Sequence, residues 1–159
     1  MKLSIVTFIA AISLLPMSIG VRAEAASPPT PDGLVVVESA NTMAETEKRL
    51  ITALDAAGLK IAARIDHQAN AGSVGLDLAP TVLFIFGNPK AGTLLMEKQR
   101  TAGIDLPLKL LLWDDNGKIK VAYNDPTYIA RRHGLDTSLP VLTQIASALR
   151  RFAEAAANP

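Results

Sequence analysis

Five consecutive apolar residues at 82–86 are the feature that most constrains the fold of this 159-residue chain. A short apolar run of this kind predicts a strand that is buried on both faces. Gly87, Asn88 and Pro89 follow it, and then a segment of helical composition begins. Asn is a favoured N-cap, and Pro is favoured at the first helical position because its missing N–H would have no partner there. The run therefore predicts a core strand that passes directly into a capped helix.

The remaining segments complete a pattern of short strands and amphipathic helices. Strands are expected at 34–38, 59–66, 81–86, 108–114 and 118–123. Helices are expected from Thr42 to Gly58, over about 89–100, over 126–133, and after a Ser138 cap. Asn116-Gly117 predicts a type I′ hairpin, whereas 67–80 reads as a long connection rich in small residues. This order predicts an α+β fold with a ferredoxin-like β-α-β-β-α-β core, an added β-hairpin strand and C-terminal helices.

The N-terminal composition predicts export. A positive charge at Lys2, an apolar stretch over 3–21 and small residues near Ala23 have the order of a secretory signal peptide at 1–23. The alternative is an uncleaved membrane anchor, although Pro16 and Gly20 weaken the stretch as a spanning helix. Residues 24–33 read as a disordered leader, and 34–157 as a single α+β domain. A periplasmic or secreted protein is expected, with no stable membrane span after cleavage.

Charge and cysteine content narrow the classes of partner and chemistry. Loss of Lys2 and Arg22 reduces the 16 basic residues to 14, against 15 acidic ones, so the mature chain is close to neutral. A chain without a basic stripe is not expected to bind nucleic acid. The chain has no cysteine, which excludes disulfides, thiolate nucleophiles and cysteine metal sites. The mature domain must therefore be stabilised by its apolar core.

Seven short motifs occur between about residues 34 and 134. They are IDH at 65–67, VGL at 74–76, PT at 80–81, FGNPKAGT and LM within 86–96, LPL at 106–108, YNDP at 123–126 and ARRHG at 130–134. In this order they resemble the domain-of-unknown-function family 302. The resemblance implies a small α+β domain, often secreted or membrane-attached in bacteria, and carries no activity over. The last helix lies outside the strongest matches.

The first candidate site is the strand-to-helix turn after residue 86. Free amides at a helix N-terminus, together with Asn88, Lys90 and Thr93, could hold a small anion. Tyr123 and Asp125, which precede another expected helix, complete the candidate ligand-binding set. The competing interpretation is that Asn88-Pro89 and Asp125-Pro126 are ordinary helix caps. The turn lacks the G-x-x-x-x-G-K-[ST] pattern, which argues against a nucleotide-binding P-loop.

The second candidate site is the pair of histidines, His67 and His133. Imidazole is a common metal ligand, so the pair could hold a metal ion or haem, although zinc usually has three or four protein ligands. The alternative is that His67 closes a strand and that His133 ends a helix, with Gly134 as its left-handed cap. No cofactor is assigned.

The ferredoxin-like topology makes a further prediction about where these residues lie. Its first and third strands are parallel, so the helix starts at Thr42, Asn88 and Asp125 are expected to cluster at one end of the sheet. The short helix over 126–133 would then carry His133 back toward His67.

The most consistent function is a non-catalytic exported module that binds a small ligand or another copy of itself. A homodimer is predicted, because a five-stranded sheet exposes edges that proteins usually cover, and Trp113 lies on an expected exposed-face strand. The alternatives are a metal- or haem-binding protein that uses the two histidines, and an enzyme that acts on a small anionic substrate. Without a cysteine or a recognisable triad pattern, the sequence contains no positive indication of catalysis.

Overall fold

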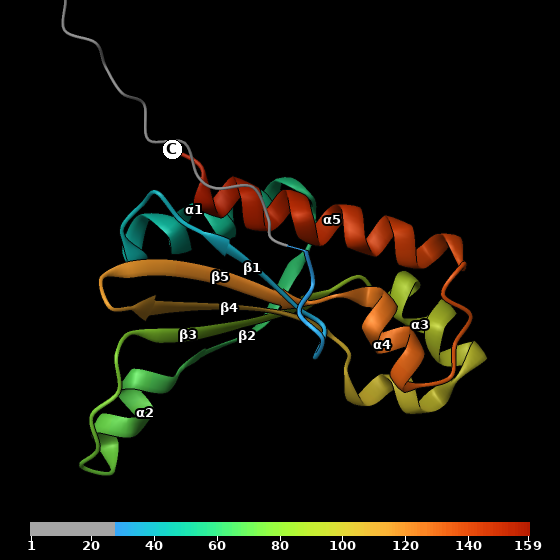
Figure 1. Ribbon diagram of the computed structural model, residues 1–159, viewed down its shortest axis with the longest axis horizontal. Helices are drawn as coiled ribbons and strands as arrows, with labels where there is room; N and C mark the ends of the chain where they lie inside the picture. Colours follow the sequence, from blue (N-terminus) through green and yellow to red (C-terminus); the bar gives the residue numbers. More distant parts are fainter. Residues whose placement is uncertain (1–27) are drawn as a thin grey trace, which may run out of the picture.

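The computed structural model describes residues 28–159, and the expected signal peptide at 1–23 lies outside the described residues, as does part of the leader at 24–33. The strands are β1 (Leu34–Glu38), β2 (Lys60–Asp66), β3 (Thr81–Gly87), β4 (Leu108–Asp115) and β5 (Lys118–Asn124). The helices are α1 (Met43–Ala56), α2 (His67–Ser73), α3 (Pro89–Lys98), α4 (Pro126–Arg132) and α5 (Pro140–Ala157), with a short 3-10 helix, η1 (Arg100–Ile104), after α3 (Figure 1).

The strands form one five-stranded sheet in the order β1-β5-β4-β3-β2, and every neighbouring pair is antiparallel. The predicted α+β class is confirmed. The strand order differs from the ferredoxin-like one, in which β1 and β3 would be parallel. After β3, the chain passes through α3 and η1 and forms β4 directly beside β3. The place next to β3 is therefore taken by β4, and β1 pairs with β5 at the far edge of the sheet.

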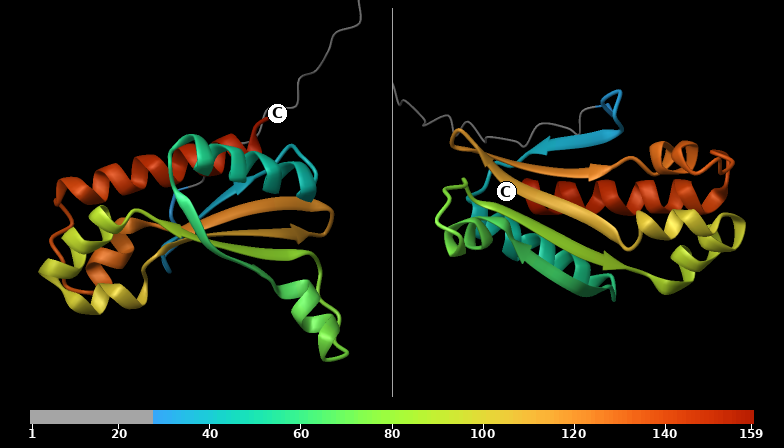
Figure 2. Two further views of the ribbon diagram at one scale, coloured as in Figure 1. Left: turned by 180° about the vertical axis from the view of Figure 1, so that it is seen from behind. Right: turned by 90° about the horizontal axis from the view of Figure 1, so that it is seen from below.

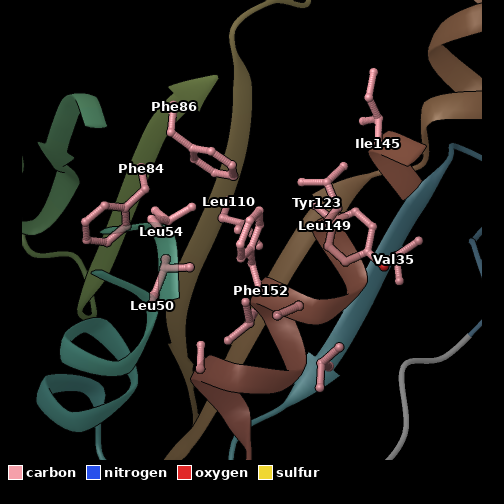
Figure 3. Packing of buried hydrophobic residues seen from close by; sticks show 14 of the residues in the cluster. Val35, Leu50, Leu54, Phe84, Phe86, Leu110, Tyr123, Ile145, Leu149 and Phe152 are labelled. Carbon is pink, nitrogen blue, oxygen red and sulfur yellow. The ribbon is translucent and has the colours of Figure 1, made fainter. Parts of the chain in front are cut away.

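The core lies between one face of the sheet and the two long helices, α1 and α5 (Figure 1). Alternate residues of each strand point into it, as the two-residue period of a strand requires. Figure 3 shows Phe86 beside Phe152 of α5; their ring centroids are 5.9 Å apart and their planes are 88° apart, an edge-to-face contact. Leu142, Ile145, Leu149 and Phe152 of α5, at helical spacing, are all buried.

Three local features show where the sequence interpretation succeeded and failed. Asn116 and Gly117 have φ of 55° and 87°, so the predicted positive-φ hairpin turn is confirmed. The prediction that 67–80 lacks regular structure was wrong, because α2 occupies 67–73; no residue of α2 is buried, so it shows no apolar periodicity. The Ser138 cap was also wrong: the Ser138 hydroxyl donates to Asp136 at 2.7 Å, and α5 begins at Pro140 without a side-chain cap.

Candidate functional site

The face of the sheet opposite α1 and α5 carries an apolar row flanked by charged side chains, and no helix of the described residues lies across it (Figure 2, right-hand view). The strand registers place one outward-facing residue from each strand in a continuous row. In order across the sheet, the row is Val36, Ala122, Leu111, Leu83 and Ile65. Ala122 is shielded by its neighbours, and the other four are half-buried. We call this row and its neighbours Trp113 and Ile85 the open face.

The open face corrects one expectation. The apolar run at 82–86 predicted burial on both sides of β3, but only Val82, Phe84 and Phe86 are covered. Leu83 and Ile85 point to the opposite side and remain half-exposed. A contiguous apolar patch on a folded domain commonly marks an interaction surface. The composition of β3 is therefore that of a buried strand, although this chain covers only one of its faces.

A second apolar surface projects from the end of the sheet. The segment 67–80, which we call the arm, consists of α2 and the loop that returns to β3, and it extends on the side of the open face (Figure 1). Val74, Leu76 and Leu78 in the arm are 71%, 65% and 44% exposed. Much of the surface of these three side chains is left uncovered by the arm. They therefore add an apolar surface next to the open face.

Asn88, Lys90 and Thr93 occupy an ordinary capped helix start. The Asn88 carboxamide oxygen accepts the Lys90 amide at 2.9 Å, and the Asn88 carbonyl accepts the Gly92 amide at 3.1 Å. Pro89 has no N–H to offer. Most of the amides that an anion would need are thus satisfied within α3, so the local geometry favours the cap over the anion site. All three candidate residues are exposed.

Asp125 caps α4 in the same way, while Tyr123 belongs to the core. The Asp125 carboxylate accepts the Thr127 amide at 3.0 Å and the Thr127 hydroxyl at 2.5 Å. Tyr123 is only 5% exposed, and its ring lies beside Leu149 of α5 (Figure 3). Burial raises the pKa of its hydroxyl, and the nearby Arg150 acts in the opposite direction. The structure therefore does not bring Tyr123 to the surface where Asn88, Lys90 and Thr93 lie.

The predicted cluster of three helix starts is also not formed. Because all neighbouring strands are antiparallel, β3 and β5 run in one direction and β1 runs in the other. Asn88 and Asp125, which follow β3 and β5, share one end of the sheet. Thr42, which follows β1, lies at the opposite end. The expectation depended on parallel β1 and β3, and the observed strand order removes it.

The two histidines lie at opposite ends of β3. His67 follows Asp66, whose partner is Val82, whereas the segment that contacts His133 precedes Leu108, whose partner is Phe86. Four residue steps of β3 separate these positions, about 13 Å at 3.3 Å per residue. The expectation that they approach each other was therefore wrong, and one chain does not offer them as a shared site. Among residues 28–159, no group of three His, Asp or Glu side chains is arranged to hold a metal ion.

His133 instead forms a polar cluster with η1. Its Nε2 lies 2.6 Å from the Asp105 carboxylate, and its Nδ1 lies 3.0 Å from the Thr101 hydroxyl. The side chains of His133 and Asp105 are 7% and 13% exposed, whereas Thr101 is exposed. Arg132 contacts the other carboxylate oxygen of Asp105 at 3.3 Å. The cluster thus joins the end of α4 to the turn between η1 and β4.

Local structure explains why these groups meet. His133 ends α4, and the following Gly134 has φ of 65°, so the predicted glycine cap is confirmed. Asp105 ends η1, and its backbone carbonyl accepts the Lys109 amine at 3.1 Å, which closes the turn before β4. Both helix ends are therefore held by backbone and side-chain contacts, and they present the imidazole and the carboxylate to each other.

A family model described as "Domain of unknown function DUF302" matches residues 35–156. The chain belongs to this family. The match extends through most of α5, beyond the motifs that carried the resemblance in the sequence. Packing of α5 against the sheet accounts for this extent, because the core is incomplete without it.

Longer relatives contain a region similar to this DUF302 domain. A protein named "Fluoride-specific ion channel FluC 1" from Brucella suis is 46% identical over 110 residues, which are 69% of this chain and 43% of that protein. A protein of the same name from Brucella abortus gives the same identity over 69% of this chain and 41% of its own length. The matched region of this chain thus spans less than half of either relative.

A solved structure supports the fold. The crystal structure of an uncharacterised DUF302 protein from Bacillus stearothermophilus superposes with a TM-score of 0.70 at 23% identity, and it covers 77% of this chain and 97% of that one. The fold is therefore that of the DUF302 family. Within residues 28–159, none of the helices has the length and apolarity needed to cross a bilayer.

Sequence reasoning found His133 but missed its two partners. Thr101 and Asp105 fall in a stretch with no apolar periodicity, and they meet His133 only because α4 packs beside η1. The one available signal was position: Asp105 directly precedes the LPL motif, and His133 lies within ARRHG.

Proposed function

We propose that this DUF302 domain is a self-associating module whose two copies pair through their open faces. The observation that carries the proposal is the apolar row across all five strands, which no helix of the described chain covers. An antiparallel sheet can face water on one side, but that side then usually carries polar residues at alternate positions. Here Leu83, Leu111 and Val36 occupy such positions in one row, while Lys109 and Lys120 lie beside it on the same face.

The open face and the arm must both contribute if a second copy is the occupant. Five strands about 4.8 Å apart, each contributing about six residues of 3.3 Å, give a sheet surface of roughly 480 Å². A stable interface buries about 800 Å² on each partner. The sheet alone falls short of this area, and the exposed side chains of the arm supply additional apolar surface on the same side. A two-fold axis would set the arm of each copy beside the sheet of the other, so one surface provides both halves of the interface.

The charged residues of β1 and β5 that lie beside the apolar row form ion pairs. Glu38 of β1 pairs with Lys120 at 2.6 Å and with Lys118 at 3.2 Å. These two amines, Lys120 foremost, lower the pKa of the Glu38 carboxyl, which keeps it ionised. A partner docking on the apolar row therefore meets a polar rim of satisfied charges, which is the usual anatomy of an interface.

The test is the oligomeric state of the mature domain, with one sheet variant and one matched control. Leu111→Asp places a charge at the centre of the row, whereas Leu94→Asp makes the same change at an exposed position of α3. In sedimentation equilibrium at micromolar concentration, wild type and Leu94→Asp should be dimers and Leu111→Asp a monomer, with circular dichroism confirming that each variant is folded. A monomeric wild type, or a Leu111→Asp variant that dimerises as well as wild type, would refute the proposal.

We also propose that the module works outside the cytoplasm after cleavage near Ala23. The charged start, apolar stretch and small-residue end of 1–23 support this. Mass measurement of protein recovered from the periplasm of an expressing bacterium should give a product that begins near Glu24. A product that retains Met1 would contradict both the cleavage and the location.

A second candidate function follows from the relatives named fluoride-specific ion channels. In this proposal the module assists a cell in handling fluoride. Deletion of the gene should lower the fluoride concentration that stops growth, while leaving the tolerance of chloride unchanged. Equal fluoride tolerance of deleted and complemented strains would rule this function out.

A further inference from the structure

The Thr101–His133–Asp105 cluster has the order of groups found in nucleophilic catalysis. A hydroxyl lies within hydrogen-bond reach of an imidazole, and the other nitrogen of that imidazole lies against a carboxylate. These two contacts are the recognised signature of an activated nucleophile: a base beside the nucleophile, oriented by a third group. Constellations of this kind occur on unrelated folds, so they are identified by geometry and not by position in the chain. Here the two ring nitrogens exchange the partners that they have in the Ser-His-Asp triad. We propose that Thr101 is a nucleophile toward small carboxylic esters, with His133 as its general base.

The two distances assign a role to each nitrogen of the ring. In a neutral imidazole one nitrogen donates and the other accepts. A carboxylate only accepts, so Nε2 of His133 must carry the ring proton and donate it to Asp105 in the 2.6 Å hydrogen bond. Nδ1 is then the acceptor, and it receives the hydroxyl proton of Thr101 across 3.0 Å. The tautomer that Asp105 selects is the one that a general base requires.

Burial and exposure are distributed as this role demands. His133 and Asp105 are almost enclosed, so their hydrogen bond has little competition from water. Thr101 is exposed on η1, where an ester can reach its hydroxyl. Arg132 balances the charge of Asp105, and its side chain remains half-exposed beside the cluster. Asp105 acts through the imidazole and is a positioning residue.

The proposed step conserves atoms and charge. The Thr101 oxygen bonds to the ester carbonyl carbon while its proton moves to Nδ1 of His133. The resulting tetrahedral intermediate collapses, the bond to the alcohol oxygen breaks, and His133 returns the proton to the departing alcohol. The products are the free alcohol and an acyl ester on Thr101. Attack by water, with His133 again taking and returning a proton, releases the acid and restores the hydroxyl.

A purely structural cluster would behave differently. If His133 only fastens α4 to η1, its loss lowers stability but does not change the reactivity of Thr101. The probe for this difference is p-nitrophenyl acetate, whose coloured product reports acylation, with peptide mapping to locate the acetyl group. His67→Ala and Thr143→Val are matched controls, because they change a histidine at the other end of the sheet and an exposed threonine on α5.

With wild type and both controls, we expect acetylation of Thr101 at equal rates. Thr101→Val should abolish it, and Thr101→Ser should retain it. His133→Ala should slow it by about 100-fold or more, the usual contribution of a general base. Asp105→Asn should lower the acylation rate constant with little change in the ester concentration at half-saturation, and Asp105→Glu should restore part of the rate. Melting curves identify any variant that fails to fold. If His133→Ala fails to fold, Asp105→Asn and Thr101→Ser still test the proposal.

Two outcomes would overturn the proposal. One is an absence of acetyl-Thr101 in wild type. The other is acetylation of Thr101 at an undiminished rate in folded Asp105→Asn or His133→Ala, which would mean that the hydroxyl reacts without help from the imidazole.

Discussion

Replacing Phe152 with Ala measures how much α5 contributes to the domain. Phe152 is 7% exposed and makes the edge-to-face contact with Phe86 at 5.9 Å. Truncating a buried Phe to Ala removes its apolar burial and leaves a cavity, at a typical cost of about 3–5 kcal/mol. A domain of this size has roughly 6–19 kcal/mol of unfolding free energy in total, at 0.05–0.15 kcal/mol per residue. We therefore expect a large loss that leaves a folded protein across that range, and only a marginally stable one if the wild type is at its lower end.

Urea unfolding followed by circular dichroism gives the loss from the midpoint, provided that the slope with urea stays constant. All variants must be compared at one protein concentration, because the proposed dimer would add to the apparent stability. The double variant with Phe86→Ala isolates the ring–ring contact, which should account for about 0.5–1.5 kcal/mol of coupling. Ile104→Ala is the control: its side chain is 74% exposed on η1, so the expected change is within about 0.5 kcal/mol. A loss below about 1 kcal/mol for Phe152→Ala, or strict additivity with Phe86→Ala, would refute the packing of α5 described above.

Three further predictions concern single positions. Asn88→Ala should cost about 1 kcal/mol in urea unfolding, the usual loss of a side-chain cap, and an unchanged midpoint would contradict the capping role. Asp66 caps α2, and the hydrogen bond from the Ala69 amide lowers its pKa, so its contribution is present above its unfolded pKa of about 3.9 and is lost as pH falls through the folded value. The stability difference between wild type and Asp66→Ala should accordingly shrink below about pH 4, and a difference that grows there would be inconsistent with this linkage. Gly33→Ala should destabilise more than Gly58→Ala: both have positive φ, of 83° and 67°, but a Cβ at Gly33 would meet the Tyr128 ring, whereas Gly58 faces open space. Equal losses in the two alanine variants would show that the contact is harmless.

Much of the local structure could be predicted from sequence because its causes are local. The cap at Asn88, the helix end at Gly134 and the hairpin at Asn116 each depend on residues within a few positions of one another. The α2 helix was missed because none of its residues is buried, so the apolar spacing that identifies a helix is absent. Apolar spacing in the sequence records which side chains of a segment are buried, so it does not identify a helix that has no buried residue.

The arrangement of the strands could not be predicted, because it depends on contacts between distant residues. The pairing of Val36 with Ala122 closes the sheet at β1 and sets β1 against the direction of β3. That one choice moved Thr42 away from Asn88. No periodicity within β1 records which strand will be its neighbour.

By itself, the sequence determined the α+β class, the family and most of the helix and strand boundaries, since composition and spacing act along the chain. Only the tertiary structure decided what the surfaces present. It left Leu83 and Leu111 uncovered on the open face, and it placed Thr101 and Asp105 against His133. The physical reason is that an outward-facing apolar residue and a core residue are chemically the same, and a hydroxyl, an imidazole and a carboxylate form a cluster only when the packing of η1 against α4 brings them within hydrogen-bond distance.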